Sequence, residues 1–460
     1  MTLIKSISGI RGTIGGTPEN NLTPIDTVRF AAAYGLWILS KHPKQKCTIV
    51  VGRDARPSGE MIQQLVQNTL VGLGIDIIDL GLSTTPTVEM AVVFERAQGG
   101  IILTASHNPI EWNALKLLND KGEFISAADG HHILELVAND DYEFATVDDL
   151  GQIKTKTDAI DQHIEAILSL PLVSIDAIRK SNFRVVVDAV NSTGGIAIPK
   201  LLDALGVSCI PLFCDPTGNF PHNPEPLKEH LSDLCQEVSQ QKADFGIVVD
   251  PDVDRLAFVD ENGEMFGEEY TLVACADYVL SKTPGDTVSN LSSTRALKAI
   301  TTAFQQQYHA AAVGEVNVVE KMKAVAAVIG GEGNGGIIYP DLHYGRDALV
   351  GIALFLSLLS EKKQRVSTLK ASFPQYFMSK KKINLKPNLD VDSLLKKISM
   401  QYQEDQPNTI DGVKIDFKDS WIHLRKSNTE PIIRIYTEAT SLADAEALAT
   451  QFIELIESLA

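Results

Sequence analysis

Gly100-Ile-Ile-Leu-Thr-Ala-Ser-His-Asn-Pro109 joins a short apolar run to a polar loop that ends at a proline. An apolar run of four to eight residues that is bounded by turn residues is typical of a buried strand. Around this run, apolar strand patterns alternate with amphipathic helix patterns. We therefore predict strands at residues 47–51, 75–80 and 100–103, and helices at 58–73 and 87–96. This alternation indicates a doubly wound α/β layer.

The same rhythm returns twice farther along the chain. A second round predicts strands at 183–188, 207–212 and 245–249 and a helix at 194–205, and a third runs from 256 to about 359 with strands at 287–291 and 324–329. The last ~85 residues differ and predict a small α+β domain. Its expected elements are helices at 391–402 and 442–459 and strands at 413–417, 421–424 and 432–438. The polar stretches 141–160 and 362–380 resemble linkers.

Composition limits the possible functions. The chain has 460 residues, too many for one hydrophobic core, and its net charge of −18 argues against nucleic-acid or anionic-membrane binding as the main function. The first residues lack the apolar core of a signal peptide, and no apolar run reaches the ~20 residues needed to span a bilayer. Five cysteines without CxxC spacing indicate reduced thiols. We therefore expect a cytoplasmic protein.

The loop after the predicted strand at 100–103 contains a candidate catalytic serine. Ligands of α/β sheets bind beyond the carboxyl ends of the strands, so Ser106 is expected to be exposed there. Pro109 prevents the loop from continuing directly into a helix. A plain Ser/Asn turn at a helix start remains an alternative for this hexapeptide. A hydrolase triad is disfavoured because the chain has no GxSxG elbow.

Asp250-Pro-Asp-Val-Asp-Arg255 follows the apolar run at 245–249. The alternating carboxylates of Asp250, Asp252 and Asp254 leave the strand end on one side, where they repel one another unless a cation or a proton relieves them. An EF-hand is disfavoured because Arg255 stands where that loop needs glycine. The segment therefore predicts a metal site, with a solvated acidic turn as the alternative.

Two further loops are suited to ligand binding. Gly330-Gly-Glu-Gly-Asn-Gly-Gly336 has five glycines around Glu332 and Asn334, which lets the backbone approach a ligand closely, although glycine-rich turns are also common without one. Arg425-Lys-Ser-Asn-Thr-Glu-Pro-Ile-Ile-Arg434 gathers cations and short hydroxyl or amide donors that can surround a phosphate. A charged hairpin turn is the alternative for this second loop.

Together and in this order, these four loops resemble the α-D-phosphohexomutase family. The resemblance extends to Ser8-Gly-Ile-Arg-Gly12, Gly52-Arg-Asp-Ala-Arg-Pro-Ser58 and Gly218-Asn-Phe-Pro-His-Asn-Pro-Glu-Pro226, and it covers essentially the whole chain. It implies three α/β domains with mixed sheets and a C-terminal α+β phosphate-binding domain around a central cleft. The expected ranges are 1–150 with the serine loop, 151–255 with the metal loop, 256–370 with the sugar loop and 371–460 with the phosphate loop.

The resemblance also implies roles for individual residues. Ser106 is the phosphoserine, and its phosphate binds Mg²⁺ together with Asp250, Asp252 and Asp254. His107 and Arg255 line the phosphoryl site. Lys116 matches a lysine assigned to proton transfer, which requires burial and neighbouring positive charge to lower its pKa if it is to act as a base. The implied substrate contacts are Arg11, Glu315, Glu332, Asn334, Arg425, Ser427, Asn428, Thr429 and Arg434.

The implied activity is the interconversion of hexose 6-phosphate and 1-phosphate through a hexose 1,6-bisphosphate, by a monomer or homodimer. Many bacterial members have a sugar loop of the form GExSGH, whereas here Asn334 stands for the serine and Gly336 for the histidine. Glucosamine phosphate is the first expected substrate, followed by mannose or glucose phosphate. A sugar phosphatase with Asp250 as nucleophile and a non-catalytic sugar-phosphate-binding relative are the competing interpretations.

Overall fold

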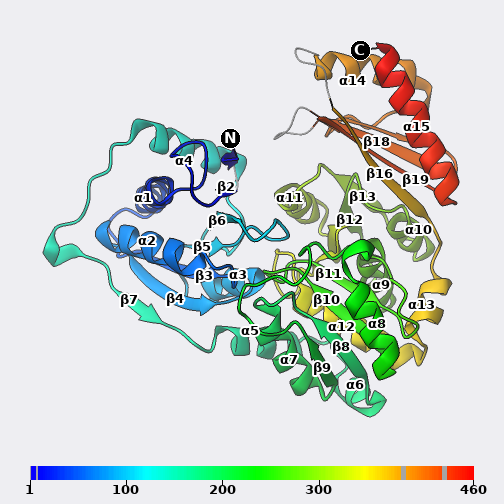
Figure 1. Ribbon diagram of the computed structural model, residues 1–460, viewed down its shortest axis with the longest axis horizontal. Helices are drawn as coiled ribbons and strands as arrows, with labels where there is room; N and C mark the ends of the chain where they lie inside the picture. Colours follow the sequence, from blue (N-terminus) through cyan, green and yellow to red (C-terminus); the bar gives the residue numbers. More distant parts are fainter. Residues whose placement is uncertain (1, 7–8, 385–389, 427–431, 460) are drawn as a thin grey trace. The chain divides into compact units, whose positions relative to one another are not determined.

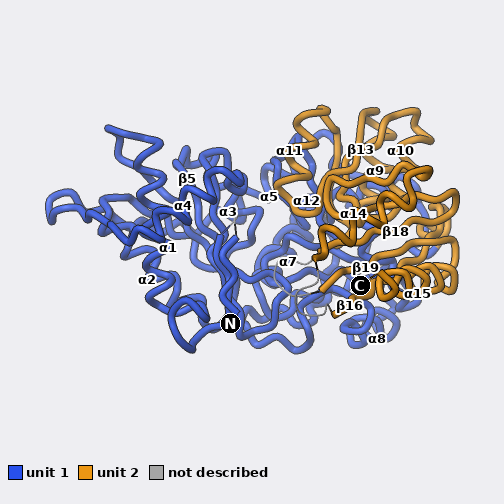
Figure 2. The backbone as a smooth tube through the Cα atoms, turned by 90° about the horizontal axis from the view of Figure 1, so that it is seen from above, with its two compact units in different colours: residues 1–271, 335–367 blue, residues 272–334, 368–460 orange. Residues whose placement is uncertain are grey.

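The computed structural model describes residues 2–6, 9–384, 390–426 and 432–459. The chain forms two compact units: unit 1 comprises Met1–Thr271 and Gly335–Ser367, and unit 2 comprises Leu272–Asn334 and Thr368–Ala460 (Figure 2). The chain passes between them at three points: within helices α9 (Glu268–Lys282) and α13 (Val366–Ser372), and between Asn334 and Gly335. Within the described ranges, none of the helices combines the length and apolar character needed to cross a membrane.

The first sheet of unit 1 has seven strands in the order β1-β2-β6-β5-β3-β4-β7 (Figure 1). Their bounds are β1 (Ile4–Ser6), β2 (Gly9–Thr13), β3 (Thr48–Arg53), β4 (Asp76–Leu82), β5 (Gly99–Leu103), β6 (Trp112–Leu118) and β7 (Ile153–Thr155). The β5-β3-β4-β7 part is parallel, whereas β6, β2 and β1 are added antiparallel. This is the mixed sheet that the family resemblance implies.

Helices cover both faces of this sheet because successive side chains of a strand point to opposite sides. Ile49 and Val51 of β3 belong to one apolar core, and Val50 between them belongs to another. The first core includes residues of α1 (Pro24–Lys41), α2 (Gly59–Gly72) and α4 (Ala127–Asn139), and the second includes residues of α3 (Thr85–Phe94) and α5 (Ala159–Leu168). The predicted doubly wound layer is therefore confirmed.

The second sheet of unit 1 has the strand order β11-β10-β8-β9. Its strands are β8 (Arg184–Asp188), β9 (Ser208–Leu212), β10 (Phe245–Val249) and β11 (Leu256–Val259), accompanied by helices α6 (Ile175–Ser181), α7 (Gly194–Leu205), α8 (Ser232–Gln241) and α12 (Ala348–Lys362). Strand β15 (Gly336–Ile338) also lies in unit 1 but belongs to a different sheet. Helix α12 is buried along almost its whole length, as expected of a core helix. Its Phe355 stacks on Phe258 of β11 with a ring-centroid distance of 3.8 Å.

Unit 2 contains strands of two sheets. In the first, β13 (Tyr308–Ala311), β12 (Thr287–Asn290) and β14 (Ile329–Glu332) are parallel neighbours, with α10 (Ala296–Ala303) and α11 (Glu315–Val325) between them in sequence. The second is an antiparallel sheet in the order β16-β19-β18-β17. Its elements are β16 (Phe377–Asn384), α14 (Val391–Gln401), β17 (Val413–Asp416), β18 (Ser420–Lys426), β19 (Ile432–Ala439) and α15 (Leu442–Leu459), an α+β arrangement as predicted.

Some expected elements are wrong. The strand predicted at 324–329 is not there, because α11 continues to Val325, Ala326 ends it in a left-handed conformation, and β14 starts only at Ile329. Both predicted linkers contain regular structure: 141–160 includes a 3-10 turn and β7, and 362–380 includes α13 and the start of β16. β7 and β16 are held by pairing with β4 and β19, which a local pattern does not show.

Candidate active site

Ser106 lies in the loop that connects β5 to β6. Its backbone is left-handed, with φ of 47°, and its N–H donates to Thr104 Oγ1 at 2.9 Å. The residue is only 8% exposed, so the expectation of an exposed serine is wrong. The cause is the acidic loop after β10, because Ser106 Oγ donates a hydrogen bond of 2.6 Å to Asp250 Oδ2.

The serine loop is held by the buried guanidinium of Arg56. This group pairs with Asp54 at 3.0 Å and donates to the carbonyl oxygens of Ser106, Asn108, Pro109 and Trp112. One cation thus satisfies four carbonyls of a tight loop, which fixes the loop backbone. Sequence reasoning did not assign this role, although three charged residues in Gly52-Arg-Asp-Ala-Arg-Pro-Ser58, directly after a buried strand, were a usable signal.

The acidic loop turns tightly after β10 and brings its three carboxylates together. Asp250 Oδ1 accepts the backbone N–H groups of Asp254 and Arg255 at 3.1 and 3.0 Å. One oxygen from each of the three aspartates lies within 4.8 Å of the others, and all three residues are fully buried. Among the described residues, Asp252 Oδ1 and Asp254 Oδ1 find no hydrogen-bond partner. Buried carboxylate oxygens of this kind fit a hard divalent cation, so this triad can bind a metal.

The electrostatics of the triad are uneven. Burial and the charges of Asp254 and Asp252 raise the pKa of Asp250 well above its usual range. Burial would also raise the pKa of Asp254, but the cations Arg346, Lys116 and Arg255 outweigh it and lower that pKa. Unrelieved repulsion within the triad is therefore concentrated on Asp250, the aspartate that contacts Ser106.

Cations and a hydroxyl from distant segments satisfy the Oδ2 atoms of Asp252 and Asp254. Lys116 of β6 donates to Asp252 Oδ2 at 2.7 Å and to Asp254 Oδ2 at 3.4 Å. Arg346 donates to Asp254 Oδ2 at 2.6 Å, and Thr85 at the start of α3 donates to Asp252 Oδ2 at 2.6 Å. The sequence analysis did not identify Arg346 or Thr85. Neither lies in a recognisable loop motif, so only the fold shows their role.

Lys116 could act as a base only if its surroundings lowered its pKa, and in this structure they do not. Burial would lower the pKa of Lys116, but the charges of Asp252 and Asp254 outweigh burial and raise it. The ammonium group is therefore charged at neutral pH. It can stabilise negative charge or donate a proton.

His107 lies beside the serine, and Arg255 lies next to His107. His107 Nδ1 is 3.3 Å from Ser106 Oγ, and its Nε2 is 3.5 Å from a guanidinium nitrogen of Arg255. Burial and then the charge of Arg255 lower the pKa of His107 well below its usual range, with Arg346 and Arg11 acting in the same direction. Glu225, within the Gly218–Pro226 motif, pairs with Arg255 at 3.2 Å and was not identified from sequence.

The candidate residues of unit 2 form a connected set of their own. Glu332 at the end of β14 accepts hydrogen bonds from Asn290 at 2.7 Å and from the N–H of Gly314 at 3.1 Å, next to Glu315. Arg425 of β18 pairs with Asp411 at 2.9 Å, and Asp411 also accepts the N–H of Val313 at 3.0 Å. Asp411 thus links the segment around Glu315 to the predicted phosphate loop.

The remaining predicted substrate contacts differ in where they lie. Arg434 lies opposite Arg425 in the β18–β19 register, and Asn334 is half-buried just after β14. Ser427, Asn428 and Thr429 lie outside the described residues. Arg11 is exposed on β2, opposite Ala114 of β6.

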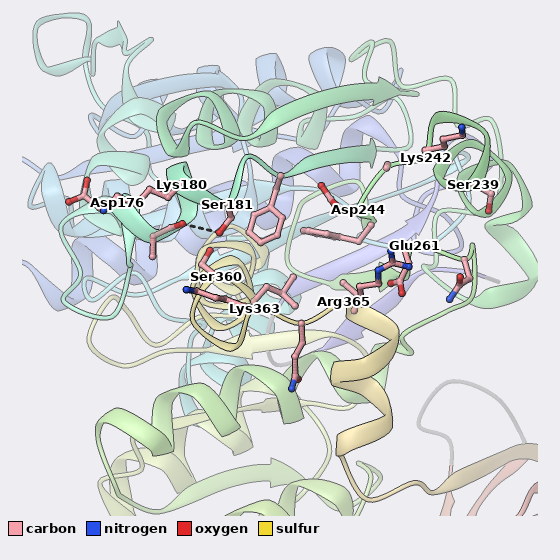
Figure 3. Close-up of a pocket in the computed structure, with 18 residues that line it drawn as sticks. Asp176, Lys180, Ser181, Ser239, Lys242, Asp244, Glu261, Ser360, Lys363 and Arg365 are labelled. Carbon is pink, nitrogen blue, oxygen red and sulfur yellow. Dashed lines mark hydrogen bonds between the residues drawn. The ribbon is translucent and has the colours of Figure 1, made fainter.

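A separate cavity of ≈ 990 Å³ lies in unit 1 and contains none of the predicted site residues (Figure 3). Its lining includes Lys180, Lys363 and Arg365, together with Phe245 at the amino end of β10. The acidic loop follows the carboxyl end of the same strand. Ligands of such sheets bind at the carboxyl ends of strands, so the loop cluster, and not this cavity, is the candidate active site.

Comparisons with known proteins agree with this assignment. The phosphoglucomutase/phosphomannomutase domain models match in order: α/β/α domain I at residues 3–144, domain II at 161–263, domain III at 267–377 and the C-terminal domain at 380–455. A relative named phosphoglucomutase/phosphomannomutase from Thermococcus kodakarensis is 34% identical and covers 96% of both chains. One named phosphoglucosamine/phosphogalactosamine mutase from Sulfurisphaera tokodaii is 31% identical and covers 98% of both.

A solved structure of a phosphoglucomutase/phosphomannomutase family protein from Burkholderia thailandensis superimposes with a TM-score of 0.86 at 25% identity, over 99% of this chain and 97% of that one. The matches therefore span all four domains, and the named relatives are mutases. The chain belongs to the phosphoglucomutase/phosphomannomutase family, the phosphohexomutases that its loop motifs resemble.

Proposed function

We propose that this phosphohexomutase interconverts hexose 6-phosphate and hexose 1-phosphate through a phosphoserine at Ser106 and a hexose 1,6-bisphosphate. The observation that carries the proposal is the 2.6 Å contact between Ser106 Oγ and Asp250 Oδ2, within a buried triad that can bind a metal. A plain turn serine would not need three buried carboxylates beside its hydroxyl. Mg²⁺ suits oxygen ligands of this kind, and when bound by the triad and the serine phosphate it would neutralise charge on the transferring group.

Side chains of the protein can move the proton of the attacking hydroxyl and stabilise the negative charge on the phosphoryl group. In the first half-reaction the bond from phosphorus to Ser106 Oγ breaks, a bond to a sugar hydroxyl oxygen forms, and the hydroxyl proton leaves. His107, kept neutral by its lowered pKa, accepts that proton and delivers it to the leaving Ser106 Oγ, which lies 3.3 Å from its Nδ1. Arg255 stabilises the charge on the phosphoryl oxygens. In the second half-reaction the other phosphate returns to Ser106, and the proton of the attacking Ser106 hydroxyl passes to His107. The departing sugar oxygen takes a proton from the charged Lys116, and transfer of the proton from His107 to Lys116 restores both groups.

The residues of unit 2 would hold the rest of the substrate. Glu332 offers a carboxylate to sugar hydroxyls. Arg425 and Arg434, with Ser427, Asn428 and Thr429 by family resemblance, would bind the phosphate that is not reacting. Arg11, Glu315 and Asn334 are proposed as further contacts. Because the bisphosphate must bind in two orientations, this site needs cations and donors that accept a phosphate from either end of the sugar.

For the sugar itself we propose glucosamine phosphate first and mannose or glucose phosphate second. The sugar loop carries Asn334 and Gly336 in place of the serine and histidine of many bacterial members, so it lacks their side-chain contacts. Relatives at similar identity are named for glucosamine, galactosamine, glucose and mannose phosphates. We expect kcat/KM with glucosamine 6-phosphate to exceed the values with glucose 6-phosphate and mannose 6-phosphate. A preference for either neutral sugar would overturn this choice and leave the phosphoserine mechanism intact.

Replacing Ser106 by alanine should abolish mutase turnover, because no acceptor for the phosphoryl group would remain. The wild-type protein should include a species heavier by one phosphate, with the phosphate mapped to Ser106 and lost on incubation with substrate. Ser360→Ala is a matched control, since Ser360 is a buried serine of α12 whose hydroxyl bonds only the carbonyl of Leu356 among the described residues. Phosphate on Asp250 would instead support the phosphatase interpretation, and wild-type protein without turnover would support the non-catalytic one.

Asp250→Asn should separate metal binding from stability. The folded-state pKa of Asp250 is raised, so metal-free stability is highest below the ordinary aspartate pKa and falls as pH rises through the interval up to the folded pKa. The asparagine variant removes this loss while its oxygen can still accept the two backbone N–H groups. We expect metal-free Asp250→Asn to melt on the order of 2–4 °C higher at pH 7, about 1 kcal/mol for a unit of this size.

The same variant should bind Mg²⁺ more weakly and turn over more slowly, because an amide replaces a carboxylate on a hard cation. Thermal melts in EDTA from pH 4 to pH 8 and Mg²⁺ titrations of activity measure the two effects. Equal Mg²⁺ dependence in both proteins would show that the triad has only a structural role.

Arg425→Lys tests the phosphate loop. Lysine keeps the charge but loses the planar guanidinium that binds a phosphate with two parallel hydrogen bonds. Binding of the non-reacting phosphate also orients the reacting hydroxyl, so kcat/KM should fall roughly tenfold to a thousandfold, for a lost interaction of about 1.5–4 kcal/mol. Arg365→Lys in the separate cavity is the control and should leave kcat/KM unchanged. If Arg425→Lys reduces the slow reaction of phosphate-free sugars by the same factor, the loop does not bind phosphate.

A further inference from the structure

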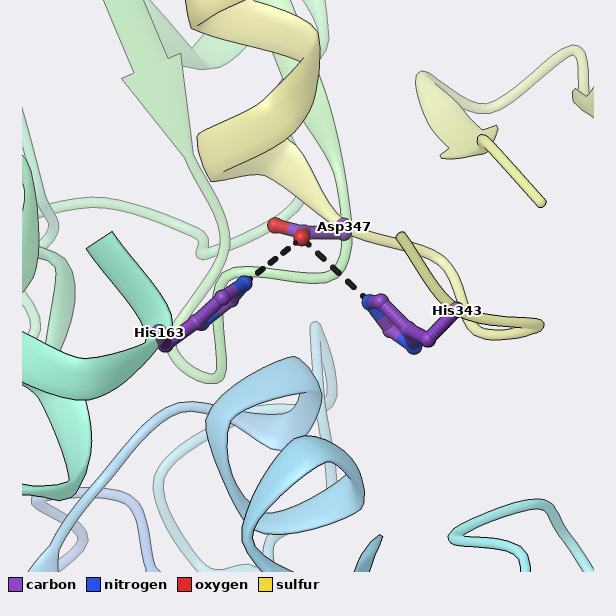
Figure 4. A group of neighbouring side chains, drawn as sticks. All are labelled: His163, His343 and Asp347. Atoms are coloured by element: carbon purple, nitrogen blue, oxygen red, sulfur yellow. Dashed lines mark hydrogen bonds and ion pairs between the residues drawn. The ribbon is translucent and has the colours of Figure 1, made fainter. Parts of the chain in front are cut away.

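A second group of metal-ligating side chains lies in unit 1, made of His163, His343 and Asp347 (Figure 4). His163 comes from α5, His343 from the loop before α12, and Asp347 is the N-cap residue of α12. Both histidines point their Nε2 atoms at the same oxygen: Asp347 Oδ2 is 2.9 Å from His163 and 3.3 Å from His343. His163 and Asp347 are fully buried, and the side chain of His343 is 12% exposed.

The spacing of these three atoms suits a tetrahedral ion. Bonds of about 2.0–2.1 Å to zinc place neighbouring ligand atoms roughly 3.3 Å apart. The two ligand–ligand distances of 2.9 and 3.3 Å match this edge to within a few tenths of an ångström. The third edge, between the two histidine nitrogens, is at most 4.8 Å, so an ion between the three atoms would draw the side chains together around it.

The second nitrogen of each ring already has an outer partner. His163 Nδ1 lies 3.0 Å from Thr87 Oγ1, which is 2.7 Å from Thr84 Oγ1, and His343 Nδ1 lies 3.4 Å from Glu89 Oε2. In metal sites a ligating histidine usually donates its other N–H to a carboxylate, carbonyl or hydroxyl, which fixes the tautomer with its free lone pair toward the metal. Thr87 Oγ1 takes that position for His163, and the Glu89 carboxylate lies beside Nδ1 of His343 at ion-pair distance.

Asp347 is also suited to be a ligand. Its Oδ1 accepts the N–H groups of Leu349 and Val350, which fixes the carboxylate and leaves Oδ2 directed at the histidines. Together with Glu89, this carboxylate can balance a divalent charge.

We propose that His163, His343 and Asp347 form a second metal site, distinct from the aspartate triad, that takes Zn²⁺ or a similar late transition-metal ion. Imidazole nitrogens select such ions, whereas Mg²⁺ prefers oxygen ligands. Three protein ligands leave a fourth position for water. The partly exposed ring of His343 is the side from which the ion enters.

The site is connected to the candidate active site through two segments. Thr87 contacts His163, and Thr85 in the same turn of α3 contacts Asp252. Asp347 contacts both histidines, and the preceding residue Arg346 contacts Asp254. A metal bound to the two histidines would therefore restrain the start of α3 and the residues before α12, the two segments that contact the acidic loop.

The test uses Co²⁺ as the probe, added to the full-length protein in saturating Mg²⁺ so that the aspartate triad is occupied. Tetrahedral nitrogen and oxygen coordination gives Co²⁺ a strong visible absorption that octahedral oxygen coordination does not. We expect one equivalent of tetrahedral Co²⁺, displaced by Zn²⁺. Binding should weaken at least about tenfold in His343→Gln, and about tenfold to a hundredfold in Thr87→Val, which keeps all three ligands.

His309→Gln is the matched control, because His309 Nε2 also lies 2.9 Å from an aspartate oxygen, that of Asp286, without belonging to any group of three ligands in the described parts of the chain. It should bind Co²⁺ like the wild type. Thr87→Val provides the test if His343→Gln does not fold. Absence of the tetrahedral absorption, equal binding by Thr87→Val and wild type, or loss of the absorption in Asp252→Asn would overturn the proposal. Retention of the signal in Ser106→Ala is expected, so the result does not depend on the proposed mutase mechanism.

Discussion

Three carboxylates buried within five residues set the electrostatic constraint on unit 1. Charged groups taken out of water must be paired, hydrogen-bonded or protonated, and the acidic loop uses ion pairs and hydrogen bonds. Backbone N–H groups and Ser106 satisfy Asp250, while Lys116, Arg346 and Thr85 satisfy one oxygen each of Asp252 and Asp254. These donors come from α3, β6 and the segment before α12. The acidic loop therefore connects these three elements through its ion pairs and hydrogen bonds. Arg56 then fixes the serine loop against it.

The division of oxygen atoms within the triad explains how the same residues can serve both protein and metal. The Oδ2 atoms of Asp252 and Asp254 accept the protein's donors. The Oδ1 atoms of the same residues have no hydrogen-bond partner in the described parts of the chain. A cation on the Oδ1 side therefore need not displace Lys116 or Arg346. Its charge would, however, lower the pKa of Lys116 from the raised value that the aspartates produce.

The sequence predicted the parts of this arrangement that depend on local pattern. Strand β10 and helix α7 have the predicted bounds, because a buried apolar run ending in polar residues and an amphipathic run ending at glycine are both local signals. Strand β6 was not predicted, although it carries Lys116, because its residues gain their strand geometry by pairing with β5 and β2. The strand predicted at 324–329 was wrong because the apolar run there is divided between two elements. Its first residues end helix α11, and its last residue begins strand β14.

Candidate site residues, too, could be predicted only where a local sequence pattern marks them. Ser106 and the three aspartates stand in loops directly after buried strands, so position and chemistry together single them out. Arg346 and Thr85 act on the same aspartates, yet both stand at the beginning of helices, where arginine and threonine have ordinary structural roles. Their function follows only from tertiary contacts that span more than 90 residues. Loop motifs in this fold therefore identify the candidate site residues, whereas the groups that set their charge come from helix ends that carry no motif.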